Sequence, residues 1–107
     1  MKLAKLGNMK NGWFVGNFEP NVLKTSDVEV AVKKYKANDY EKKHFHKIAT
    51  EITLIVSGEV EMNKKRYREG DIIVIEPNEA TDFLAITDAM TIVVKKPSAK
   101  DDKYYAE

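Results

Sequence analysis

Apolar and polar residues alternate with a period of two along much of the chain. In the segment 28–33, for example, three valines alternate with Glu29, Ala31 and Lys33. This is the period of β-strands, whose successive side chains point to opposite faces. The pattern predicts strands over residues 28–35, 51–56, 59–62, 66–67, 72–75, 80–86 and 90–95. The polar stretch 36–43 predicts a connection, and no stretch has a convincing helical period, so we expect an all-β sandwich or closed barrel.

One domain accounts for the whole chain. Its 107 residues suffice for one modest hydrophobic core and are too few for two. We expect a barrel over residues 28–96, preceded by an N-terminal segment, 1–27, that packs on the barrel or on a partner. The aromatic stretch 13–18 predicts an edge strand or lid that completes the core, with a dimer contact or a pocket wall as the alternative. Residues 97–107 are predicted to be a charged tail, either mobile or strapped onto a partner.

The composition narrows the classes of partner and of chemistry. With 18 basic and 17 acidic residues the formal net charge is +1, which gives no reason to expect nucleic acid or a membrane as partner. The absence of cysteine excludes disulfides, thiolate metal sites and a cysteine nucleophile. No apolar run resembles a membrane span or a signal peptide, so the expected location is the cytoplasm.

The two histidines of the chain, His44 and His46, stand one residue apart. On a strand, residues at this spacing project to the same face, roughly 7 Å apart along the backbone. Glu51 is an odd number of residues further on and would face away on an unbroken strand. A turn over residues 47–50 would bring Glu51 to the start of the next strand, facing the same interior.

Two imidazoles and a carboxylate form a ligand set typical of divalent transition metals, and they leave coordination positions open for water or substrate. The alternative is that His44 and His46 are ordinary solvated residues at a strand end, among neighbouring lysines. The HxH spacing by itself does not decide between these interpretations.

The surrounding residues resemble a known family. His44, His46, Glu51 and Gly58 fall in the pattern H-x-H-x4-E-x6-G, which is similar to the first conserved motif of the cupin superfamily. The second cupin motif begins with glycine, has a proline several residues on, and supplies another histidine ligand. Its layout is matched here with one extra residue between the glycine and the proline. The positions concerned are Gly70, Pro77, Glu79 in place of a further glycine, and Asp82 in place of the histidine.

The resemblance implies a single-domain, jelly-roll β-barrel with a metal ion inside it, bound by His44, His46 and Glu51. Asp82, at the position of the family's fourth ligand, is expected either to complete the set or to be a loop residue that makes local backbone hydrogen bonds. A set of two histidines, one glutamate and one aspartate suits Fe, Mn, Zn or Ni.

Four functional classes follow. The first is a metal-dependent enzyme that acts on a small carboxylate, carbonyl or sugar-like molecule. The others are a non-catalytic module that binds a small ligand or metal, a cupin similar to sugar-nucleotide isomerases and epimerases, and an interaction protein with a vestigial site. We assign no catalytic residue, although some polar side chains could reach a pocket rim, namely Tyr35, Tyr67, Arg66 and Arg68.

The strand at 51–56 also predicts an interface. If Glu51, Thr53 and Ile55 line the interior, then the alternate row must face outward. That row is Ile52, Leu54 and Val56. An apolar row on the outside must be covered by the N-terminal segment or by another subunit, so we expect a homodimer.

Overall fold

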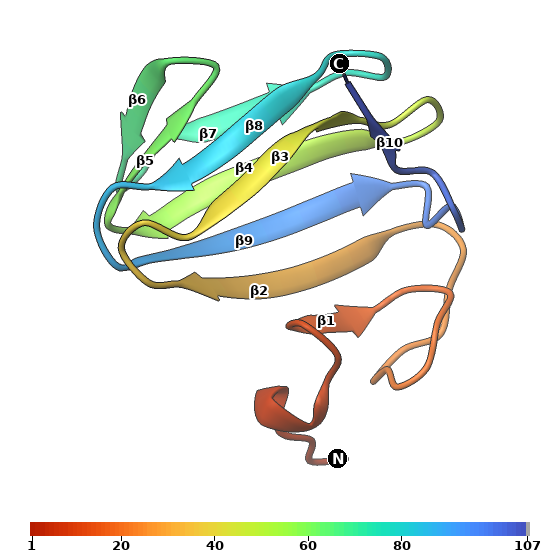
Figure 1. The fold of residues 1–107 in the computed structure, drawn as a ribbon. Helices are drawn as coiled ribbons and strands as arrows, with labels where there is room; N and C mark the ends of the chain where they lie inside the picture. Colours follow the sequence, from red (N-terminus) through yellow and green to blue (C-terminus); the bar gives the residue numbers. More distant parts are fainter. Residues whose placement is uncertain (107) are drawn as a thin grey trace.

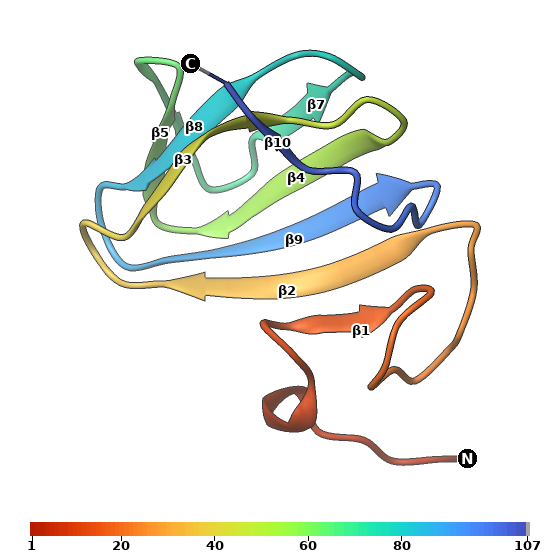
Figure 2. The same cartoon turned by 45° about the vertical axis from the view of Figure 1, so that its right-hand side comes forward.

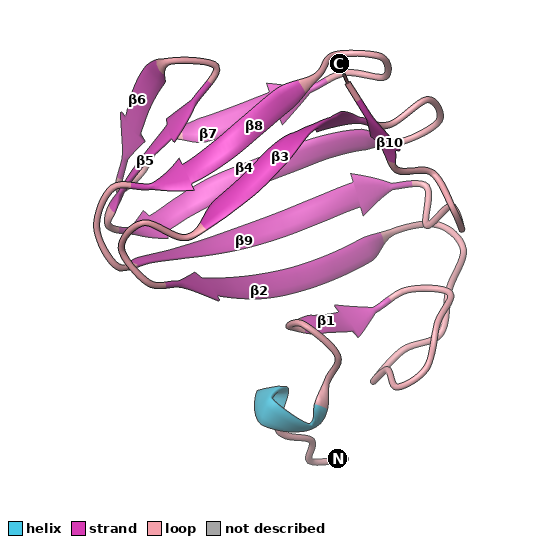
Figure 3. Ribbon diagram, in the orientation of Figure 1, coloured by secondary structure: helices cyan, strands magenta, loops and turns pink. Residues whose placement is uncertain are grey.

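The computed structural model describes residues 1–106 and is built almost entirely from β-strands (Figures 1 and 3). Its elements are η1 (Leu6–Asn8), β1 (Trp13–Val15), β2 (Glu29–Tyr35), β3 (Tyr40–Phe45), β4 (Thr50–Ser57), β5 (Glu59–Met62), β6 (Lys65–Arg68), β7 (Ile72–Ile75), β8 (Thr81–Ala85), β9 (Ala89–Lys96) and β10 (Tyr104–Tyr105). The all-β prediction is confirmed. Within residues 1–106, no helix has the length and apolar character that crossing a membrane requires.

The strands form two five-stranded sheets whose neighbouring strands are antiparallel. The strand orders are β1-β2-β9-β4-β7 and β10-β3-β8-β5-β6. From β2 to β10 the chain changes sheet at every connection except the one between β5 and β6, so that two facing sheets are wound together. Figure 2 shows the first sheet running from β1 at its edge through β2, β9 and β4. This is a jelly roll, as the cupin-like motif implied.

The interior has an apolar end and a polar end. The core is built around Ile55 and Val60, both fully buried, together with Phe83 and Ala85 from β8. Toward the other end of the same strands the inner face becomes charged, because Glu29, Lys95 and Glu51 stand opposite one another across β2, β9 and β4. The hydrophobic core therefore closes one end of the sandwich, and a polar site lies at the other.

The predicted strands from β4 to β9 are all present, and no boundary is shifted by more than one residue. The expected connection at 36–43 is wrong, since β3 begins at Tyr40 and pairs with β8. Its residues are mostly polar, so the alternation of apolar residues gives no sign of a strand. The strand forms because its backbone groups hydrogen-bond to those of β8. The aromatic stretch contributes β1, an edge strand in which Trp13 pairs with Ala31.

Candidate functional site

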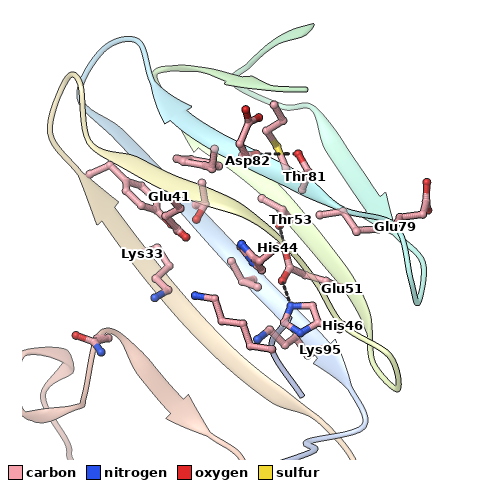
Figure 4. A pocket seen from close by; sticks show the side chains of 18 of the residues that line it. Lys33, Glu41, His44, His46, Glu51, Thr53, Glu79, Thr81, Asp82 and Lys95 are labelled. Carbon is pink, nitrogen blue, oxygen red and sulfur yellow. Dashed lines mark hydrogen bonds and ion pairs between the residues drawn. The ribbon is translucent and has the colours of Figure 1, made fainter. Parts of the chain in front are cut away.

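The polar end of the space between the sheets contains a cavity of about 260 Å³. Side chains reach it from both sheets and from the C-terminal segment, and Figure 4 shows them gathered between the strands. They include Lys33, Glu41, His44, His46, Glu51 and Lys95. The volume is close to the lower end of the range usual for small-molecule pockets, so its occupant should be small.

A β-bulge in β3 turns both Glu41 and His44 toward the cavity. On a regular strand, residues three apart point to opposite faces. The register of β3 against β8 shifts between Glu41 and His44, and the extra residue of a bulge reverses the alternation. His46 lies just beyond the end of β3 and also lines the cavity. The bulge thus adds a carboxylate to the pair of histidines that the spacing predicts.

Main-chain carbonyls hold both imidazole rings. Nδ1 of His44 donates to the carbonyl oxygen of Lys42 at 2.9 Å, and Nδ1 of His46 donates to that of Asp102 at 2.6 Å. A carbonyl oxygen only accepts, so each ring carries a proton on Nδ1, and in the neutral form its lone pair is on Nε2. The pKa of His44 lies below its ordinary value because the ring is partly buried, which favours that neutral form.

The buried end of His46 faces a carboxylate. Nε2 of His46 lies 3.4 Å from Oε1 of Glu51, and Figure 4 shows the two groups directed at each other. His46 is 5% exposed, and its Nε2 has no hydrogen-bond partner among residues 1–106. A lone pair and a carboxylate repel each other in this arrangement. A cation between them, either a second ring proton or a metal ion, removes the repulsion.

Glu51 is held in its ionised form. Burial raises the pKa of its carboxyl, but the contact with His46, the charge of Lys95 and the hydroxyl of Thr53 outweigh burial and lower the pKa below its ordinary value. Thr53 Oγ1 donates to Glu51 Oε2 at 3.0 Å. The prediction that Glu51 turns to meet the histidines therefore agrees with the geometry, and Thr53 fixes its orientation.

Asp102, near the end of the chain, holds the loop between β3 and β4. Its Oδ1 accepts the N–H groups of Lys47 and Ile48 at 3.0 and 3.1 Å, and its Oδ2 accepts those of Ile48 and Ala49 at 3.1 and 3.0 Å. Burial acts to raise the pKa of Asp102, but these backbone donors outweigh burial and lower it. Since the carbonyl of Asp102 also binds His46, one residue fixes both the loop and the ring.

The C-terminal segment is therefore a strap on its own chain. Residues 97–106 fold back over the barrel, in contrast to the mobile tail or partner strap that the sequence suggested; Glu107 lies outside the described residues. Strand β10 pairs with β3 beside His44, and the ring of Tyr104 stacks on Phe45 with centroids 5.5 Å apart. The acidic pair before two tyrosines gave no sequence signal for this role, because only the fold brings it to the loop.

Tyr35 and Glu41 form a second polar pair in the cavity. The Tyr35 hydroxyl donates to Glu41 Oε1 at 2.9 Å. Burial, together with the charge of Glu41 and this hydrogen bond, raises the pKa of Tyr35 far above its ordinary value. Tyr35 thus keeps its proton at neutral pH. Of the other polar groups considered for the rim, Arg66 and Arg68 are exposed on β6.

Asp82 lies on β8 at the far end of the cavity from His46 (Figure 4). Its Oδ1 accepts the backbone N–H of Asn63 at 2.8 Å, in the turn between β5 and β6. Of the two roles that the sequence leaves open for Asp82, this hydrogen bond to the backbone fits the structural one rather than the metal ligand. The structure brings His44, His46 and Glu51 together and leaves Asp82 engaged elsewhere.

The three neighbouring side chains have the chemistry of a metal site. Two imidazole Nε2 atoms and an ionised carboxylate form a borderline-hard donor set. The Nε2 of His46, which has no hydrogen-bond partner among the described residues, is the atom that a metal would satisfy. Within residues 1–106, no three His, Asp or Glu side chains lie close enough together, as they are now placed, to coordinate one metal ion. The donor types and their protonation fit a divalent transition metal, whereas the present side-chain positions pair Glu51 with His46.

The sequence matches no protein-family model and no curated protein. The fold is nevertheless shared with solved structures. An uncharacterised conserved protein with a double-stranded β-helix domain from Klebsiella pneumoniae aligns with a TM-score of 0.72 and 22% identity, over 80% of this chain and 75% of that one. An RmlC-like cupin from Shewanella frigidimarina aligns with a TM-score of 0.66 and 18% identity, over 73% of this chain and 72% of that one.

Oxalate decarboxylase from Bacillus subtilis also aligns, with a TM-score of 0.67 and 14% identity, over 75% of this chain and 24% of that one. Mn(II) centres are described in that enzyme. These likenesses confirm that the present chain has the cupin fold, as its first motif predicted. Function has to be argued from the site, because one fold supports many activities.

Proposed function

We propose that the protein binds a divalent transition metal ion, Fe, Mn, Zn or Ni, through His44, His46 and Glu51, and acts as an enzyme on a small carboxylate or carbonyl compound. The observation that carries this proposal is the buried Nε2 of His46, which has no hydrogen-bond partner in the described part of the chain and lies 3.4 Å from the Glu51 carboxylate. A metal ion would satisfy both groups at once.

The surrounding residues support this role. The carbonyls of Lys42 and Asp102 orient the two rings, and Thr53 orients Glu51. Outer contacts of this kind commonly fix the direction of metal ligands. When bound, such an ion supplies Lewis acidity that polarises a carbonyl or carboxylate oxygen. The cavity of about 260 Å³ leaves space for a small molecule beside the ligands.

The metal content of the purified chain tests the proposal. In protein purified without a tag and supplied with Fe, Mn, Ni and Zn, we expect about one metal ion per chain, falling by at least about tenfold in His46→Ala and in His44→Ala. Asp82→Ala is the matched variant, because its carboxylate lines the same cavity but binds the amide of Asn63. It should keep the metal.

Elemental analysis gives the answer directly. Protein that contains no metal in any of these preparations would contradict the proposal. Loss of metal in Asp82→Ala would instead assign Asp82 as a fourth ligand. If the metal is present at full occupancy but a panel of small acids, carbonyl compounds and sugars is not turned over, the protein is a binding module rather than an enzyme.

A homodimer is part of the proposal. The outer face of the first sheet exposes Ile52, Val74 and Ile72, which are 41%, 52% and 64% accessible, respectively. The N-terminal segment extends this sheet at the β2 edge through β1. Three exposed aliphatic side chains on adjacent strands form the kind of patch that soluble proteins usually bury against a partner.

Sedimentation velocity tests the dimer. Wild-type protein should sediment at twice the mass of one chain, and Val74→Lys should sediment as a monomer because a charge in the apolar interface loses its hydration. Thr87→Lys, at an exposed turn position, should leave the dimer intact. A wild-type monomer at high concentration would count against this part of the proposal.

A further inference from the structure

Lys33 carries an ammonium group that makes no ion pair within residues 1–106. Lys33 lies on the inner face of β2 between Ala31 and Tyr35, is partly buried, and lines the cavity. Among residues 1–106 its amino group makes no ion pair or hydrogen bond, and its close neighbour is the ring of Trp13, 5.4 Å away. Burial lowers the pKa of Lys33, and together with the charges of Lys95 and Lys103 it outweighs the charges of Glu41 and Glu51, which act to raise that pKa. Such a group favours a negative ligand.

The carboxylates around the cavity already have partners. Glu41 accepts from the Tyr35 hydroxyl, and Glu51 accepts from Thr53 and faces His46. Glu29 pairs with Lys95 at 3.6 Å. The other two carboxylates of the lining, Glu79 and Asp82, accept the backbone N–H groups of Glu76 and Asn63. Each carboxylate of the lining therefore has a hydrogen-bond donor, whereas the ammonium of Lys33 makes no ion pair or hydrogen bond within residues 1–106.

Thr91 adds a second unsatisfied group directly opposite. Thr91 pairs with Lys33 in the register of β2 and β9, and its side chain is fully buried and lines the cavity. Its Oγ1 has no hydrogen-bond partner within residues 1–106. The neighbouring Tyr35 hydroxyl directs its hydrogen to Glu41 and so does not donate to Thr91. The Thr91 hydroxyl is near enough to Tyr35 to act on the pKa of that phenol, which it lowers, but its Oγ1 makes no hydrogen bond of good geometry within residues 1–106. A buried hydroxyl without a partner indicates that a ligand or water completes its bonding.

We propose that Lys33 and Thr91 form a recognition subsite for the carboxylate of a small organic acid. The ammonium of Lys33 would supply the charge, and the hydroxyl of Thr91 would donate a hydrogen bond to a carboxylate oxygen. As a description of substrate recognition, the subsite rests on the proposed function, since the acid would then lie beside His44, His46 and Glu51. One ammonium and one hydroxyl match a singly charged carboxylate better than a phosphate dianion, which needs more donors.

Propionate is the probe, because it is small, singly charged and a poor chelator. In the full chain as purified, titration followed by backbone amide chemical shifts should show saturable binding centred on β2 and β9. Propionamide, its neutral analogue, should bind at least about tenfold more weakly, as expected when a charge-assisted hydrogen bond is lost. Inorganic phosphate should also bind more weakly than propionate.

Lys33→Met should weaken propionate binding by at least about tenfold, and Thr91→Val by about three- to tenfold. Lys34→Met is the matched control, because Lys34 is the adjacent, exposed residue on the opposite face of β2. The affinity of this variant for propionate should stay within about twofold of the wild-type affinity. Circular dichroism of each variant establishes that it is folded. Lys33→Met protein that binds propionate as wild type does, or equal binding of propionamide, would overturn the subsite. Tighter binding of phosphate would overturn the carboxylate assignment.

Metal content, measured on the same samples, separates the two proposals. If propionate binding depends on Lys33 in protein without metal, the subsite stands and the metal proposal fails. If metal is present and Lys33→Met changes nothing, the subsite fails alone.

Discussion

Replacing Asp102 with asparagine is expected to lower the free energy of unfolding by about 3 kcal/mol, the cost of a few buried donors losing a charged acceptor. The carboxylate accepts hydrogen bonds from three consecutive amides, those of Lys47, Ile48 and Ala49. In asparagine one of the two oxygens becomes an NH₂ group, which would face an N–H donor. Denaturant unfolding measures the change.

The adjacent Asp101→Asn variant is the control, because it makes the same chemical change at an exposed position. Its stability should remain within about 0.5 kcal/mol of wild type. Equal losses in the two variants would contradict a specific role for Asp102. Metal content should fall in Asp102→Asn as well, because the loop carries His46.

The pH dependence of the free energy of unfolding tests the role of the Asp102 carboxylate in a second way. Because the folded-state pKa of Asp102 is lowered from the ordinary value of 3.8, its ionisation contributes stability that is present above that value. The contribution is lost as the pH falls through the lower, folded-state pKa. The stability difference between wild type and Asp102→Asn should therefore be full at neutral pH and shrink below about pH 4. A constant difference down to the acid transition would argue against this linkage.

Substituting alanine for Gly58 should destabilise the protein by about 3 kcal/mol or more, because backbone strain and a steric clash add together. Gly58 follows β4 with φ of +86°, a conformation that residues with a Cβ rarely adopt. A Cβ atom there would lie 2.2 Å from the carbonyl oxygen of Asp88 and 2.8 Å from the Cα of Ala89. These are backbone atoms, so the turn before β9 would have to move.

Gly70→Ala isolates the strain. Gly70 has a similar φ of +90°, but a Cβ atom there would have no neighbour within 4 Å. The Gly70→Ala substitution should lower the free energy of unfolding by only about 1–2 kcal/mol. Thermal or denaturant unfolding of the two variants compares them, and a Gly58→Ala protein no less stable than Gly70→Ala would show that the close packing of the two turns is unimportant.

Period-two alternation predicts most of this fold because each strand has one buried face. It fails at residues 40–43, where Tyr40 and Lys42 carry no apolar signal and the strand forms through backbone pairing with β8. Alternation in β2 also leaves open which face is internal. The structure buries Ala31 and turns Lys33 and Tyr35 to the cavity, so the charged row, rather than the valines, faces inward.

The histidine pair and Glu51 were predictable because their spacing and one turn determine their common direction. Asp102 was not, since it lies 56 residues from His46 in the sequence and no local pattern links the two. Thr91 and Lys33 were equally hidden, because the role proposed for them rests on polar groups that are left unsatisfied within residues 1–106. The periodicity of a sequence indicates which residues are buried. Whether a polar group has a hydrogen-bond partner depends on the three-dimensional structure.

The use of main-chain carbonyls to hold both imidazoles affects how this site can change by mutation. The oxygens that bind Nδ1 belong to Lys42 and Asp102, and a carbonyl is present whichever side chain a residue carries. No single substitution at either position deletes the acceptor itself; it can only displace it by moving the backbone. The tautomers of the two rings are therefore more robust to sequence drift than they would be with carboxylate partners, while insertions or deletions in the segment before β10 would shift the acceptor for His46.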